Sequence, residues 1–82
     1  MILNMYAVRD VRTQAYLKPV FVQNDAVLER ALKDGIADEN SLFHHHPEDY
    51  QVFRLGEYDD STGTVTAQPP EHMYNLVDLQ EK

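Results

Sequence analysis

The stretch "YQVFRLGEYDDSTGTVTAQ", residues 50–68, decides the fold, because it predicts a β-hairpin. Aromatic and β-branched residues run along both of its arms, which is the composition of strands. Between the arms lies "DDSTG", where Asp59 begins a turn and Gly63 stands at a position that favours a positive φ. We therefore expect two antiparallel strands joined by a tight turn.

Side-chain alternation divides the first hairpin strand into two faces. Tyr50 and Arg54 share one face, while Phe53 and Leu55 have the opposite parity. We expect Phe53 and Leu55 to point into the core. The proline pair at residues 69–70 lacks backbone donors, so we expect it to end the returning strand.

Two further strand segments precede the hairpin. Residues 2–9, "ILNMYAVR", alternate imperfectly, as in a strand with one buried face and one partly solvated face. Residues 15–23, "AYLKPVFVQ", have strand composition, but Pro19 removes a backbone donor, so this segment is an edge strand or is interrupted there. We expect it to pair back onto the first strand.

One helix is predicted between these strands and the hairpin. Asn24 or Asp25 can cap its first turn. Its apolar positions form a single stripe at helical spacing, which is typical of a helix that covers a sheet: Val27, Leu28, Ala31 and Leu32. We expect this helix to end by about Asp38.

Together these elements predict an α+β fold, a small antiparallel sheet with one covering helix in the order strand, strand, helix, strand, strand. Residues 1–82 are expected to form a single domain, with a folded core over residues 1–70. Residues 71–82 are expected to be a C-terminal tail, docked as a short helix or as a strand.

Length, charge and composition limit the classes of protein to which this chain could belong. A chain of 82 residues is small for a single core, so we expect a homodimer. Fourteen acidic and seven basic residues give a net charge of -7, which disfavours nonspecific coating of nucleic acid and means that DNA binding would need a local basic patch. Without cysteine, an exported-protein signal or a long apolar run, a soluble cytoplasmic protein with no membrane contact is expected.

The run "HHHPEDY", residues 44–50, raises the question of a metal site. On an extended segment His44 and His46 would point the same way and could chelate an ion, with His45 pointing away. Only this pair of ligands is visible, so we expect no specific metal site and no cofactor. Asp49 is expected to bind backbone donors at the strand entrance, and no residue is nominated as catalytic.

A longer pattern is more specific than any of these short motifs. It consists of Phe21, Arg30, Phe43, His46-Pro47, Asp49-Tyr50, Phe53, Leu55-Gly56, Asp59-Asp60 and Gly63. In this combination the chain resembles the small non-structural protein of gokushoviruses, which are single-stranded DNA phages of the Microviridae. The opening, "MYAVRDVR" followed by "YLKP", is also similar, whereas the tail after Pro70 matches little and His44 and His45 depart from the pattern.

This resemblance implies a non-enzymatic phage protein of the bacterial host cytoplasm that is absent from the mature virion. It implies a role in the replication or packaging of a single-stranded genome, through binding of single-stranded DNA, and it carries over no catalytic residues. The alternative is an acidic interaction protein that contacts the phage replication initiator, the procapsid or a host replication protein without binding DNA. The net charge favours this alternative, and the resemblance favours DNA binding.

Single-strand binding needs aromatic rings that stack on bases and cations that follow the phosphates. The candidates are Tyr6, Arg9, Arg12, Tyr16, Lys18, Arg30, Tyr50 and Arg54. The basic residues of the first two strands could share one neighbourhood with Arg54. The competing interpretation is that the tyrosines fill a small core or a dimer interface and that the arginines pair with acids, as Arg30 could with Asp49 or Asp60.

Overall fold

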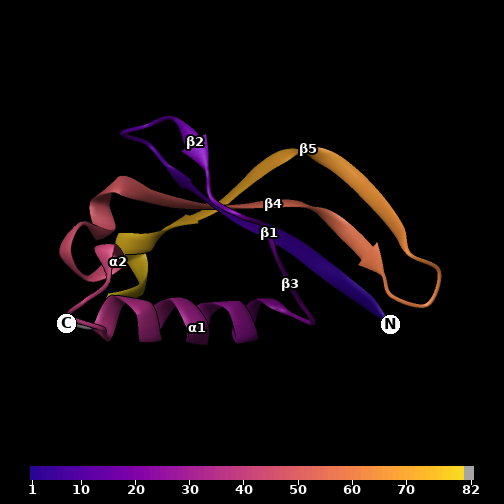
Figure 1. Ribbon diagram of the computed structural model, residues 1–82, viewed down its shortest axis with the longest axis horizontal. Helices are drawn as coiled ribbons and strands as arrows, with labels where there is room; N and C mark the ends of the chain where they lie inside the picture. Colours follow the sequence, from indigo (N-terminus) through magenta and orange to yellow (C-terminus); the bar gives the residue numbers. More distant parts are fainter. Residues whose placement is uncertain (81–82) are drawn as a thin grey trace.

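The computed structural model describes residues 1–80, which form an α+β fold (Figure 1). In chain order the elements are β1 (Ile2–Asp10), β2 (Ala15–Tyr16), β3 (Val20–Val22), α1 (Asp25–Ala37), the one-turn helix α2 (Leu42–His45), the 3-10 turn η1 (Pro47–Asp49), β4 (Tyr50–Asp59), β5 (Thr64–Asn75) and the 3-10 turn η2 (Leu76–Leu79). The predicted fold class is confirmed. Among these residues no helix has the length and apolar composition needed to cross a membrane.

The sheet is antiparallel and is organised around β1. One edge of β1 pairs with β4 along its whole length, and β4 pairs in turn with β5. The other edge of β1 pairs with β2 near its end and with β3 near its middle. The segment around Pro19 separates β2 from β3, so the predicted interruption of this strand at the proline is confirmed.

Helix α1 covers one face of this sheet, which we call the inner face. The side-chain oxygen of Asn24 accepts a hydrogen bond of 3.1 Å from the backbone of Val27, so Asn24 is the N-cap. Leu28 and Leu32 of α1 are buried against the sheet, where they pack with Val52. In Figure 1, α1 and α2 lie on the same side of the sheet, and no described helix covers the other side.

The turn of the β4–β5 hairpin has the predicted chemistry. Gly63 has a φ of 75°, and its N–H donates to the carbonyl oxygen of Asp59 at 2.7 Å. The carboxylate of Asp59 accepts a second hydrogen bond, of 2.9 Å, from the backbone of Ser61. The neighbouring Asp60 lies 2.7 Å from the N-terminal amine, so the turn also anchors the start of β1.

The prediction of which β4 side chains face the core is wrong. Tyr50 and Val52 are buried on the inner face, with 6% and 0% of their surfaces exposed, whereas Phe53 and Leu55 are only partly buried. Both parities of β4 carry large apolar side chains, so alternation alone does not identify the covered face. Pairing with β1 determines which face of β4 is covered, because Val52 lies opposite Val8 beneath α1.

The prediction that the proline pair ends the last strand is also wrong. β5 continues through residues 69–70 to Asn75, because it is an edge strand and the prolines fall where its register against β4 shifts. At such a bulge no ladder hydrogen bond is required of them. The tail that follows is docked through the fully buried Leu76, as far as residue 80; residues 81–82 of the predicted tail lie outside the described residues.

We expect Gly56→Ala to lower the free energy of unfolding by about 3 kcal/mol, as measured by urea denaturation. Gly56 has a φ of 146°, and a Cβ there would overlap the carbonyl oxygen of Thr66 on β5. Gly63→Ala is the matched control, because its φ of 75° is also left-handed but no atom lies within 4 Å of the added Cβ. It should cost about 1 kcal/mol, the penalty of a left-handed conformation for a residue with a Cβ. Equal losses in the two variants would contradict the close approach at Gly56.

We expect Tyr74→Phe to raise the free energy of unfolding by about 1 kcal/mol at neutral pH. The Tyr74 hydroxyl is buried without a hydrogen-bond partner among the described residues. Burial, with a smaller contribution from Glu29 and Asp25, raises the pKa of Tyr74 to about 12 from its usual value of 10.0. Since the unfolded chain ionises first, the wild type should lose stability as the pH rises from 10 to 12.

The same alkaline loss should be smaller in Tyr74→Phe, which has no hydroxyl to ionise. Chemical denaturation followed by circular dichroism at several pH values measures both effects. Tyr58→Phe, on the other face of the sheet, is the control and should leave stability at neutral pH unchanged. A Tyr74→Phe variant less stable than the wild type would show that the hydroxyl has a partner.

Candidate nucleic-acid interface

The face of the sheet opposite α1 forms a continuous surface, which we call the outer face. Tyr6 and Val8 of β1 point to the inner face, so alternation places Leu3, Met5, Ala7 and Arg9 on the outer face. On the neighbouring strands, further side chains lie directly across from these β1 residues or across from the residues that pair with them. They complete the outer face: Tyr16, Phe21, Gln51, Phe53, Tyr58, Val65 and His72.

Aromatic rings dominate the outer face. The Tyr16 and Phe53 rings meet edge to face with centroids 5.5 Å apart, and Phe53 meets the His72 ring at 5.4 Å in the same way. A second pair, Phe21 and Tyr58, lies 5.4 Å apart near the other end of β1. Tyr16 and Phe21 expose 42% and 46% of their surfaces, so both rings are available for stacking.

The charge on the outer face differs from that of the whole chain. No residue of the outer face is acidic, although the chain carries twice as many acidic as basic residues. Arg9 lies in register between Tyr16 and Gln51 and makes no ion pair with the described residues. The acids at neighbouring sheet positions, Asp10 and Glu57, have the inner-face parity.

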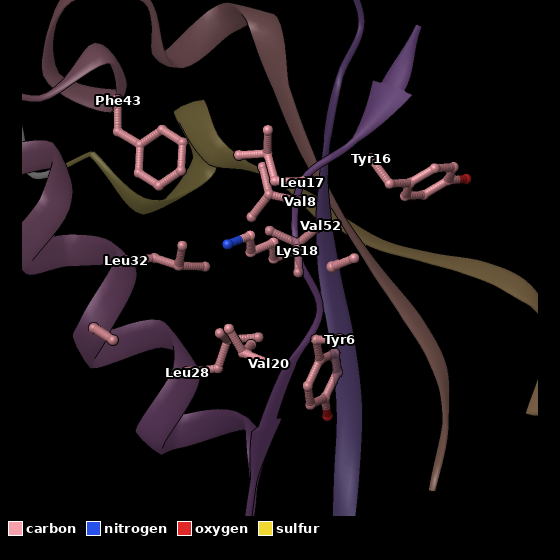
Figure 2. A pocket seen from close by; sticks show the side chains of 12 residues that line it. Tyr6, Val8, Tyr16, Leu17, Lys18, Val20, Leu28, Leu32, Phe43 and Val52 are labelled. Atoms are coloured by element: carbon pink, nitrogen blue, oxygen red, sulfur yellow. The ribbon is translucent and has the colours of Figure 1, made fainter. Parts of the chain in front are cut away.

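Two of the predicted DNA-binding rings lie in the core instead. Tyr6 and Tyr50 are 2% and 6% exposed, and both pack against the buried residues beneath α1. Phe43 of α2 meets the Tyr50 ring edge to face, with centroids 4.8 Å apart. Bases could not reach either tyrosine in this fold, so the competing interpretation of these rings as core residues agrees with the structure. Tyr16 is different, and in Figure 2 its ring points away from Leu28 and Leu32.

The predicted basic patch is dispersed. Arg54 has inner-face parity and donates hydrogen bonds of 2.7 Å to Gln68 and 3.0 Å to Asn4, while its guanidinium lies 3.9 Å from Glu57. It therefore stabilises the bulged part of the sheet. Lys18 lines a groove on the inner side of the sheet. Of the basic residues expected to share one neighbourhood, Arg9 alone lies on the outer face.

The remaining two arginines are solvent-exposed and far from one another in the chain. Arg12 lies in the turn after β1, 3.9 Å from the carboxylate of Asp49. Arg30 is on the exposed side of α1, on the opposite side of the sheet from the outer face. Among residues 1–80 it pairs with neither Asp49 nor Asp60. The Asp49 carboxylate faces Arg12, and the Asp60 carboxylate contacts the N-terminal amine.

Four outer-face rings were not among the predicted DNA-binding residues: Phe21, Phe53, Tyr58 and His72. A signal for two of them was present in the sequence, since Phe21 and Phe53 both belong to the pattern that carries the family resemblance. Phe53 lies on the outer face beside Tyr16, and not in the core as its strand parity predicts.

The histidine run forms a joint between helix and hairpin. His44 and His45 lie in α2, so the extended geometry assumed for chelation is not present. Their rings hydrogen-bond at 2.8 Å to the carbonyl oxygens of Ile36 and Glu39, respectively, which ties α2 to the end of α1 and to the following connector.

His46 is the one histidine of the run that lies beside carboxylates. Its ring nitrogen is 3.7 Å from Glu48, and Asp49 places a third ligand atom within 4.8 Å of both. His46 and Glu48 are exposed, and the Asp49 carboxylate faces the Arg12 guanidinium. The positive charge of Arg12 disfavours a second cation at this point.

Comparison with known proteins places the chain in a family. A search of curated proteins and a search of solved structures found no match. The model of one protein family matches residues 3–79, which include the sheet, α1, the histidine run at residues 44–46 and nearly all of the described tail. The chain therefore belongs to the family described as "Phage ORF5 protein" and is a bacteriophage protein.

Proposed function

We propose that this phage protein acts without enzymatic activity in the replication or packaging of a single-stranded DNA genome, and that its outer face binds the single strand. The observation that carries the proposal is the outer face itself, which combines exposed rings with Arg9 and contains no carboxylate. Every base has a π-face, so bases of any sequence can stack on exposed aromatic side chains, and a nearby cation can contact the phosphates.

The family resemblance supports the biological setting of this proposal. Among gokushoviruses, the similar protein is non-structural, which corresponds to a place in the host cytoplasm and outside the mature virion. The corrected position of Phe53 adds to this support, because the pattern residues Phe21 and Phe53 both contribute rings to the outer face.

Protein contact is the second candidate function. The outer face is largely apolar, and the net charge of -7 opposes the approach of a polyanion to most of the molecule. An apolar, open sheet face is also a surface on which two copies could associate as the expected homodimer, or on which a replication initiator, a procapsid or a host replication protein could bind. A dimer through this face would cover the rings and exclude DNA.

Fluorescence anisotropy with a labelled oligothymidine at low salt tests DNA binding. We expect Phe21→Ala to weaken binding by about tenfold, because it removes a half-exposed stacking ring. Arg9→Ala should weaken binding and reduce the slope of log affinity against log salt by about 0.7, the effect of one lost phosphate contact.

Arg30→Ala is the matched control, because Arg30 is exposed on α1 and lies away from the outer face. It should leave both affinity and salt slope unchanged. Equal effects of Arg9→Ala and Arg30→Ala, or the absence of binding at low salt, would exclude the outer face as the DNA site. Light scattering at several concentrations completes the test. A stable dimer that Phe21→Ala converts to a monomer, together with no DNA binding, would establish the protein-contact function.

A further inference from the structure

A groove of about 660 Å³ lies between α1 and the segment that connects β2 to β3 (Figure 2). Its wall on one side is α1, with Leu28 and Leu32, and its floor is the inner face of the sheet around Val8. Leu17 and Val20 form the other wall, and each exposes 43% of its surface. The groove therefore offers an aliphatic lining that the chain itself leaves partly uncovered.

One charged side chain reaches into this apolar groove. Lys18 is the single charged residue of the lining, and Figure 2 shows its amino group directed toward α1. Among residues 1–80 no carboxylate lies within ion-pair distance of it, although acids outnumber bases two to one in the chain. Such a cation can hold an anionic group at the mouth of the groove while the groove holds an apolar body.

We propose that this groove binds an aliphatic monocarboxylate of the fatty-acid class. The acyl chain lies between α1 and β3, and the carboxylate contacts the amino group of Lys18. The volume falls in the range of small-molecule sites, and the lining has the expected character, apolar side chains with one placed polar group. A single lysine is a point charge that suits one carboxylate, whereas a phosphate is usually held by several donors.

This groove opens on the other side of the sheet from the proposed DNA interface, because α1 and the outer face lie on opposite sides. Two residues of the outer face, Ala7 and Tyr16, also border the groove, whereas Lys18 and the helix residues belong to the groove alone. The inference does not rest on DNA binding, and either one can fail while the other holds. The rim residues Leu17 and Val20 give the driving force, since a bound acyl chain would remove their exposed surface from water.

Methyl NMR of the full chain, titrated with sodium decanoate below its micelle concentration at neutral pH, tests the proposal. We expect saturable shifts of the methyl signals of Val8, Leu17 and Leu28, with little change at Val65 on the outer face. Lys18→Met keeps an apolar side chain of similar length and removes the charge. It should weaken decanoate binding by about tenfold and leave the binding of decanol unchanged.

Lys33→Met is the matched control, because Lys33 is an exposed lysine of α1 that does not line this groove. It should bind decanoate as the wild type does. Circular dichroism of both variants checks that each is folded. The proposal is overturned if no saturable shift occurs, if the shifts concentrate at Val65 and Met5, or if Lys18→Met binds decanoate as tightly as Lys33→Met does.

Discussion

The structure depends on the packing of one helix against one face of a thin sheet. Leu28 and Leu32 of α1 meet Tyr6 and Val52, and these side chains form most of the buried core. Among the described residues α1 is the one long helix, so the face that it covers also determines which face stays open. Both proposed binding surfaces follow from the position of α1. One is the uncovered outer face, and the other is the groove between α1 and the segment that connects β2 to β3.

Local chemistry made several elements predictable from the sequence. Asn24 begins α1, Gly63 closes the hairpin turn, and Pro19 divides β2 from β3, because each acts through its own backbone or nearest neighbours. The face of β4 was not predictable in this way. Tyr50, Val52 and Phe53 are all large and apolar, and only pairing with β1 and contact with α1 distinguish them.

The candidate site likewise depends on tertiary pairing that local sequence signals do not predict. Its rings come from several strands, and their grouping depends on registers that no local signal specifies, as when Phe53 meets Tyr16 on one side and His72 on the other. The histidine run was ambiguous for a related reason. Whether His44 chelates a metal or ties α2 to Ile36 depends on whether the segment is extended or helical, and the helix follows from a Ser41 cap.

The prolines of β5 have a consequence for the behaviour of the protein at high concentration. An uncovered apolar sheet beside a long free edge would ordinarily invite another chain to add its own strand and begin aggregation. In β5 the bulge and residues 69–70 interrupt the row of backbone donors along that edge. A sheet so protected can keep its rings exposed for a partner while it resists growth into a larger assembly.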